Sequence, residues 1–277
     1  MNPASAAMVR WVWRRMPFKA IIKPVARGIQ SSRLMPNCWM RCLRAYRILS
    51  FDYGHMRSAA MMRSVDRDGN PVPWITYPAC AFLQQLDFRD KVVFEYGCGD
   101  STVFWSRVAA HVDSVEDNMA FCREVWPRLP ENCTLRFEPD PDEYIQAVAK
   151  RPGGYDLIVI DGHSRVRCAE IAPRHLRSGG VIILDNSDWF SDASGTLREA
   201  DLIEVDMAGL APINDFVTTT SFYFHREFRG ASKSERQPVG APGSRPKPPF
   251  PKVTRREPSP TGMREHASPI REPAGGS

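Results

Sequence analysis

The sequence predicts an α/β fold in which helices cover both faces of a mostly parallel sheet. Short apolar segments alternate with helical ones between residues 70 and 228, and a glycine-containing loop follows the first apolar segment. The 277 residues suffice for one such domain with extensions. We therefore expect a basic, partly helical extension at 1–69, an α/β domain at 70–228, and a disordered tail at 229–277.

Seven segments of the central region have the composition and length of strands, which predicts one Rossmann-like sheet. The expected strands are Val92–Tyr96, His111–Glu116, Thr134–Phe137, Tyr155–Ile160, Val181–Leu184, Leu202–Val205 and Val217–Phe224. The expected helices between them are Thr102–Ala110, Asn118–Arg128, Pro141–Lys150 and Val166–Leu176. The last strand alternates Thr with apolar residues, which is typical of an edge or antiparallel strand.

The charged residues are unevenly distributed along the chain. Residues 1–50 hold ten Lys and Arg and no acid, residues 229–277 hold ten bases and four acids, and the part between holds 17 bases and 28 acids. Because the positive charge lies at the ends and not on the expected catalytic body, we do not expect a nucleic-acid substrate. The seven cysteines form no CxxC pair, and no apolar run reaches the roughly 20 residues that span a bilayer. We expect free thiols and a cytoplasmic protein.

The two ends of the chain carry different expectations. Aromatic and aliphatic residues mix with Arg and Lys around Pro17 and Pro24, which is typical of a basic amphipathic surface helix. Such a segment would contact a membrane surface or a partner, serve as an organelle transit peptide, or pack on the core as a helical extension. From Gly230 onward, apolar residues are too sparse to offset the entropy of ordering, so we expect disorder.

The loop after the first strand carries what a nucleotide-like ligand needs. Gly97 and Gly99 let the backbone approach a ligand closely, and the helix that opens beside Ser101 points its amide groups at it. Glu116 closes the second strand, where a carboxylate can accept both hydroxyls of a ribose. Two glycines in a turn are weak evidence alone, so the choice of cofactor depends on the neighbouring residues.

These neighbours favour S-adenosylmethionine over a nicotinamide dinucleotide. The third glycine of the dinucleotide-binding fingerprint would fall at Thr102, where a β-branched side chain hinders close contact between helix and strand. Glu95 lies two residues before the first glycine and can reach the charged amino group of the methionine portion. An NAD-dependent oxidoreductase and a non-catalytic cofactor-binding protein that docks through its basic ends are the alternatives.

Three segments together resemble class I S-adenosylmethionine-dependent methyltransferases. The loop Glu95–Thr102 resembles their first motif, Tyr155–His163 their fourth-strand motif, and Leu176–Asp185 the turn and strand that follow. The resemblance covers about residues 74–224 and departs at Ser101, where the family often has a third glycine. It implies methyl transfer from S-adenosylmethionine to an oxygen or nitrogen of a small-molecule or glycan acceptor.

The resemblance also implies which residues contact the cofactor. They are Glu95, Gly97, Gly99, Ser101, Glu116, Asp117 and Asp140. Glu116 would bind the ribose hydroxyls and Asp117 would flank the adenine. Asp140 would contact the adenine amino group, although Glu138 and Asp142 are close enough in sequence to take that role. Solvated loop ends are the alternative interpretation of these acids.

The acceptor side rests on fewer residues. Asp161 and His163 follow the fourth strand, at the sheet edge where open α/β folds bind ligands. His163 would remove a proton from the acceptor, since imidazole titrates near neutral pH, or would only hydrogen-bond the loop. Trp189, after the fifth strand, would wall the acceptor pocket. Tyr77 and Trp74 would form a lid, with packing at a helix start as the alternative.

A metal-dependent variant is a further alternative. Asp161 with Asp185 and Asn186 resembles the ligand set of the divalent-metal-dependent catechol and caffeoyl-CoA O-methyltransferases, and carboxylate and amide oxygens suit Mg²⁺. However, His163 stands where those enzymes usually carry a further acid. We therefore favour a reaction without a metal.

Overall fold

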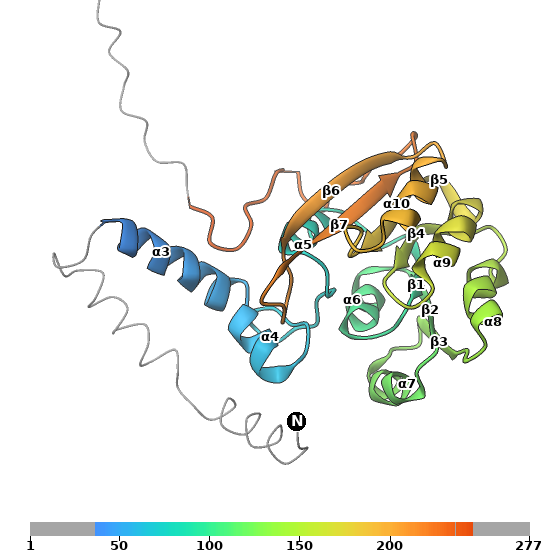
Figure 1. Cartoon of the computed structure of the whole chain (residues 1–277), viewed down its shortest axis with the longest axis horizontal. Helices are drawn as coiled ribbons and strands as arrows, with labels where there is room; N and C mark the ends of the chain where they lie inside the picture. Colours follow the sequence, from blue (N-terminus) through green and yellow to red (C-terminus); the bar gives the residue numbers. More distant parts are fainter. Residues whose placement is uncertain (1–36, 236, 246–277) are drawn as a thin grey trace, which may run out of the picture. The chain divides into compact units, whose positions relative to one another are not determined.

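The computed structural model describes residues 37–235 and 237–245, and every structural statement below concerns these residues (Figure 1). Most of the expected tail and residues 1–36 of the basic extension lie outside the described residues. So do Pro17 and Pro24, around which the amphipathic pattern was recognised. The described residues up to Ser244 fall in one compact unit.

One seven-stranded sheet forms the centre of the fold, as predicted (Figure 1). The strands are β1 (Val92–Tyr96), β2 (His111–Glu116), β3 (Cys133–Phe137), β4 (Tyr155–Ile160), β5 (Leu176–Asp185), β6 (Ile203–Leu210) and β7 (Val217–Phe224). Their order is β3-β2-β1-β4-β5-β7-β6, with β1 to β5 parallel. β7 runs antiparallel to both β5 and β6, in agreement with its alternating sequence. The strand order reverses between β1 and β4, which is where such sheets bind ligands.

Helices flank the sheet on both faces (Figure 1). The helical segments are α3 (Asn37–Arg47), η1 (Ile48–Asp52), α4 (His55–Met61), α5 (Tyr77–Leu83), α6 (Asp100–Val108), α7 (Met119–Val125), η2 (Trp126–Arg128), α8 (Pro141–Gln146), η3 (Ala147–Lys150), α9 (Arg165–Ile171), η4 (Ala172–His175) and α10 (Ser191–Arg198). Helices α8, α9 and α10 share one apolar cluster with Ile158 and Ile160 of β4. Helices α5 and α6 share another with Leu157 and Val159. Burial on both faces explains why β4 is almost entirely apolar.

Three element boundaries differ from the sequence-based expectation. The α-helix expected to reach Leu176 ends at Ile171 and is followed by η4, and β5 begins at Leu176, five residues before the expected start. β6 continues to Leu210 because it pairs with β7 along its whole length, through an Ala-Gly step with little strand preference of its own. All seven cysteines are free thiols, as expected. Within the described ranges, no helix is long and apolar enough to cross a membrane.

Candidate active site

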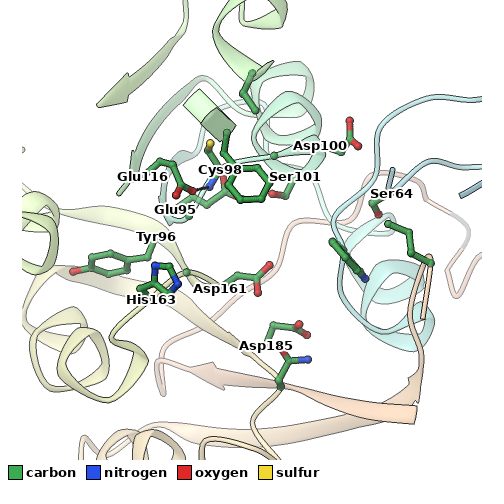
Figure 2. Close-up of a pocket in the computed structure, with 18 of the residues that line it drawn as sticks. Ser64, Glu95, Tyr96, Cys98, Asp100, Ser101, Glu116, Asp161, His163 and Asp185 are labelled. Carbon is green, nitrogen blue, oxygen red and sulfur yellow. Dashed lines mark hydrogen bonds between the residues drawn. The ribbon is translucent and has the colours of Figure 1, made fainter. Parts of the chain in front are cut away.

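A cavity of about 580 Å³ opens beside the carboxyl ends of β1, β4 and β5 (Figure 2). The glycine loop lines it together with the ends of β2, β4 and β5, and residues 62–64 and 213–216 complete the wall. The volume lies within the range of sites that hold a small molecule or cofactor. Most residues predicted to form a site are brought together here: Glu95, Gly97, Gly99, Ser101, Glu116, Asp117, Asp161, His163, Asp185, Asn186 and Trp189.

Gly97 and Gly162 hold two loops in close contact at the floor of the cavity. Gly97 has φ = +100°, a left-handed conformation that favours glycine, and a Cβ there would lie 3.3 Å from the Gly162 backbone. A Cβ on Gly162 would overlap the hydroxyl of Tyr144 and come within 2.9 Å of the Gly97 nitrogen. Gly162 stands in the fourth-strand motif, but the sequence alone indicated no role for it.

The backbone conformation and packing at Gly99 do not require a glycine. Its φ of 170° is ordinary extended backbone. A Cβ on Gly99 would meet only the Ser101 hydroxyl, at 4.0 Å. Since Gly99 lines the cavity, the absence of a side chain leaves space in the cavity that no protein atom fills.

Glu95 has an unpartnered carboxylate oxygen at the wall of the cavity. The side chain is 1% exposed, and Oε2 accepts hydrogen bonds from the hydroxyls of Thr102 at 2.5 Å and Ser114 at 3.3 Å. Oε1 has no hydrogen-bond partner within the described part of the chain. Burial raises the pKa of Glu95 to about 7, although the nearby hydroxyls of Ser101, Thr102 and Ser114 act against the shift. A buried carboxylate with a free oxygen suits a cationic ligand group.

Glu116 holds the glycine loop through the backbone. Its two carboxylate oxygens accept hydrogen bonds from the amides of Cys98 at 3.0 Å and Asn118 at 2.8 Å. Burial raises the pKa of Glu116, and its interaction with Asp117 adds to the shift. Each carboxylate oxygen has a second lone pair, so Glu116 retains the capacity to accept hydrogen bonds from a ligand.

His163 is the more exposed of the two predicted catalytic residues. Its side chain is 74% exposed, and Nδ1 lies 2.5 Å from the Asp117 carboxylate. This contact joins the loop after β4 to the loop after β2. The contact is of the kind that the alternative interpretation of His163 expected, and its role in proton removal stays a prediction.

Asp161 and Asp185 both bring a carboxyl group to the cavity. Figure 2 shows the two groups directed into the space that faces Ser64. Burial raises the pKa of Asp161 to about 6, against the opposing effect of Arg165. Burial, and secondarily the charge of Asp161, raises the pKa of Asp185 to about 8.

Arg165 joins the loops after β4 and β5, a role that the sequence did not indicate. Its guanidinium lies 4.6 Å from the centre of the Phe190 ring. It donates hydrogen bonds to the Asp161 carboxylate, the Gly162 carbonyl and Asn186 Oδ1, each at 3.0 Å, and to the Asp185 carbonyl. A salt bridge of i,i+4 spacing could have suggested the contact with Asp161, but the contacts with the β5 loop require the fold.

The carboxylates considered for Mg²⁺ already have partners in the protein. Asp161 pairs with Arg165, Asp185 accepts a 2.6 Å hydrogen bond from Thr220, and the Asn186 amide bonds Thr218 at 3.1 Å. No group of three or more His, Cys, Asp or Glu side chains able to hold a metal occurs among the described residues.

Aromatic side chains form the rim of the cavity. Trp189 is 59% exposed and stacks on Phe216, with ring centres 5.6 Å apart and planes inclined by 29°. The indole nitrogen of Trp74 donates a 3.0 Å hydrogen bond to Asn214 on the same rim. Phe121 lines the cavity from α7. Trp189 and Trp74 both line the cavity, and their contacts with an acceptor or a cofactor stay predictions.

Two predicted residues lie outside the cavity lining. Tyr77 is buried at the start of α5, where its ring packs 4.6 Å from that of Tyr53 and its hydroxyl bonds His55 at 3.1 Å. The Asp140 carboxylate caps α8 by accepting hydrogen bonds from the amides of residues 142 and 143. These contacts give both residues structural roles, and their predicted contacts with ligands stay predictions.

A cluster of one acidic and two basic side chains lines the cavity and was not predicted from the sequence. The Asp100 carboxylate, at the start of α6, accepts hydrogen bonds from both Arg63 and Arg128. Arg63 comes from the segment after α4, so the ion pair fastens that segment to the glycine loop. The adjacent Ser64 hydroxyl is buried and has no partner within the described ranges.

Comparisons with known proteins give matches among solved structures alone. No family model and no curated protein matches the chain. A precorrin-6y C5,15-methyltransferase from Geobacter metallireducens is 17% identical, with a TM-score of 0.44 over 53% of this chain and 86% of that one. The N-methyltransferase NodS from Bradyrhizobium japonicum, in complex with S-adenosyl-L-homocysteine, is 13% identical, with a TM-score of 0.38 over 49% and 78%.

A fibrillarin pre-rRNA processing protein from Methanococcus jannaschii is 17% identical, with a TM-score of 0.42 over 55% of this chain and 75% of that one. Likenesses of this size concern the arrangement of the fold alone.

Proposed function

We propose that this chain is an S-adenosylmethionine-dependent methyltransferase. The observation that carries the proposal is the unpartnered Oε1 of Glu95 on the wall of a cavity to which Gly99 adds empty space. A buried carboxylate needs a partner, and the ammonium group of a methionine portion supplies one. Gly99 leaves room for the ligand backbone, and Glu116 offers lone pairs to two ribose hydroxyls. These residues fit the ligand that the sequence resemblance implies.

The bound cofactor supplies a methyl group on a positively charged sulfur, and the protein aligns the acceptor with it. Transfer to an acceptor oxygen or nitrogen would leave the cofactor as a neutral thioether, since its sulfur would keep the electron pair of the broken bond. The acceptor's proton then has to move to a base. Asp161 and the residues around it would align the acceptor and take up this proton.

We assign the proton acceptor to Asp161 and a positioning role to His163. The Asp161 carboxyl faces the cavity, and with a pKa of about 6 it is ionised at neutral pH. Arg165 holds it at 3.0 Å. The Asp117 contact of His163 fixes the loop that carries Asp161.

The rim supports an acceptor that carries a ring and hydroxyl or amino groups. An exposed aromatic pair such as Trp189 and Phe216 stacks against a sugar or another flat ring. Asp161, Asp185 and Asn186 supply oxygens that accept hydrogen bonds from hydroxyls. A small molecule or glycan with these features suits the site better than a long anionic chain, since acids outnumber bases among the lining residues.

Calorimetric titration with S-adenosylmethionine, S-adenosylhomocysteine and NAD tests the cofactor. We expect binding of the first two, and loss of that binding in Gly99→Arg, which fills the space beside the loop. Binding of NAD alone, or of none of the three, would contradict the proposal. Incubating the protein with S-adenosylmethionine labelled in its methyl group and candidate acceptors then identifies the product class. Repeating that assay with Mg²⁺ and with a chelator tests the preference for a reaction without a metal.

A further inference from the structure

Helix α3 (blue in Figure 1) turns its apolar stripe to solvent. Trp39, Leu43 and Tyr46 lie one helical turn apart on the same face, because their spacing is i, i+4 and i+7. They are 62%, 41% and 59% exposed, whereas Met40, on a different face, is buried. A helix that only packs on the core would bury its largest apolar side chains. This helix presents them outward.

The helix that carries the stripe is basic on its other sides. Arg41, Arg44 and Arg47 belong to the same helix, which contains no acid. Arg47 pairs with Asp52 at 3.2 Å, so one of the three charges is partly balanced. The sequence around the helix is equally one-sided, with ten Lys and Arg and no Asp or Glu in residues 1–50. The occupant of this surface is therefore expected to be anionic.

We propose that the Trp39–Leu43–Tyr46 stripe of α3 docks this protein onto an anionic lipid surface. Trp and Tyr prefer the boundary between lipid head groups and acyl chains, because their rings are apolar with one polar tip. The arginines elsewhere on the same acid-free helix add longer-range attraction to acidic lipids. An RNA partner would require the positive groups themselves to face the ligand, whereas the outermost residues here are two aromatic rings and a leucine. The proposal does not depend on the methyltransferase function.

The experiment is co-sedimentation of the full chain with phosphatidylcholine vesicles prepared with and without phosphatidylserine. We expect binding to the phosphatidylserine vesicles that weakens as salt is added, and much weaker binding to phosphatidylcholine alone. The variant with Trp39→Ser, Leu43→Ser and Tyr46→Ser should bind at least about tenfold more weakly, since it loses the inserted apolar surface.

The matched control removes exposed apolar side chains elsewhere, by Ile203→Ser on β6 and Val217→Ser on β7. This control should bind vesicles as the unchanged protein does. Equal binding by the α3 variant, or binding of the unchanged protein to neither vesicle, overturns the proposal. A dimer in sedimentation velocity that the α3 variant converts to a monomer would assign the stripe to a second copy of the chain. If RNA displaces the unchanged protein from vesicles and the α3 variant does not respond to RNA, the stripe would be assigned to nucleic acid. Either result overturns the proposal.

Discussion

The hydroxyl of Thr102 donates a 2.5 Å hydrogen bond to Glu95 Oε2 and accepts one from the Gly99 amide at 3.0 Å. One fully buried side chain therefore connects the end of β1 to the start of α6. It also fixes which oxygen of Glu95 is engaged and which remains without a partner. The β-branched residue that argued against a dinucleotide thus has a structural reason to be at this position.

Thr102→Val should destabilise the protein while Thr102→Ser should not. Valine has the same shape but removes the shorter of the two hydrogen bonds that Glu95 Oε2 accepts and the acceptor of the Gly99 amide, at a cost of about 1–3 kcal/mol. Serine retains the hydroxyl. Urea unfolding followed by circular dichroism measures the difference. Equal unfolding midpoints for the valine variant and the unchanged protein would show that the hydroxyl contributes nothing.

Cofactor affinity should rise with pH up to about 7. Burial raises the pKa of Glu95 to about 7, so below this pH the group is protonated and attracts an ammonium poorly. The α-amino group of a ligand stays charged to about pH 8, so Glu95 is the partner in this contact whose charge changes below pH 7. Affinity for S-adenosylhomocysteine should fall by up to about tenfold for each pH unit below 7.

Glu95→Gln is the control for this pH dependence, because the amide keeps the shape without a titrating group. It should bind weakly at all values of pH, with a flat profile, in calorimetric titrations. If its profile retains the slope of the unchanged protein, the titrating group lies elsewhere.

The two glycines of the loop should respond differently to alanine. Gly97→Ala forces a Cβ onto a residue with φ = +100° and against Gly162, and should lower the free energy of unfolding by about 1–3 kcal/mol. Gly99→Ala meets no protein atom closer than 4.0 Å, so stability should be retained while cofactor binding weakens. Unfolding and calorimetry on both variants separate the two roles. A Gly99→Ala protein with unchanged affinity would remove Gly99 from the binding site.

The sequence predicted the sheet well because its strands carry local signals. β4 is apolar since both faces are covered, and β7 alternates since its neighbours run antiparallel to it. The residues predicted to bind the cofactor could also be grouped from the sequence, because Glu95, Gly97, Gly99 and Glu116 lie at the ends of adjacent strands. Parallel strands bring these ends to one edge, whatever the details of the helices.

The remaining site residues depend on contacts between distant segments. Arg63 reaches Asp100 across 37 residues, and Arg165 reaches the β5 loop through backbone carbonyls that leave no trace in the sequence. Tyr77 has the residue type and position of a lid, but its burial against Tyr53 follows from how α5 packs. Asp140 likewise has the expected place after β3, yet its carboxylate caps the next helix.

Asp161→Asn should lower kcat by about 10²–10⁴ and leave cofactor affinity nearly unchanged. The amide cannot take up the acceptor's proton, whereas the cofactor contacts lie on the glycine loop. In the unchanged protein the rate should rise with pH through about 6, since the base must be ionised, and burial sets that pKa. His163→Gln should change kcat only a few-fold. The opposite ranking of the two variants would return the base to His163.

Trp189→Ala should raise the KM for the acceptor on the order of tenfold, because the acceptor's ring loses a stacking surface. Trp189→Phe keeps that surface and should remain close to the unchanged protein. Trp189 is an exposed lining residue of the cavity, whereas Glu95 is a buried one on another strand end. The affinity for S-adenosylhomocysteine should therefore be the same in both variants. Steady-state kinetics with the labelled-methyl assay give KM and kcat separately. A loss confined to kcat, with KM unchanged, would mean that Trp189 orders the loop after β5 and does not bind the acceptor.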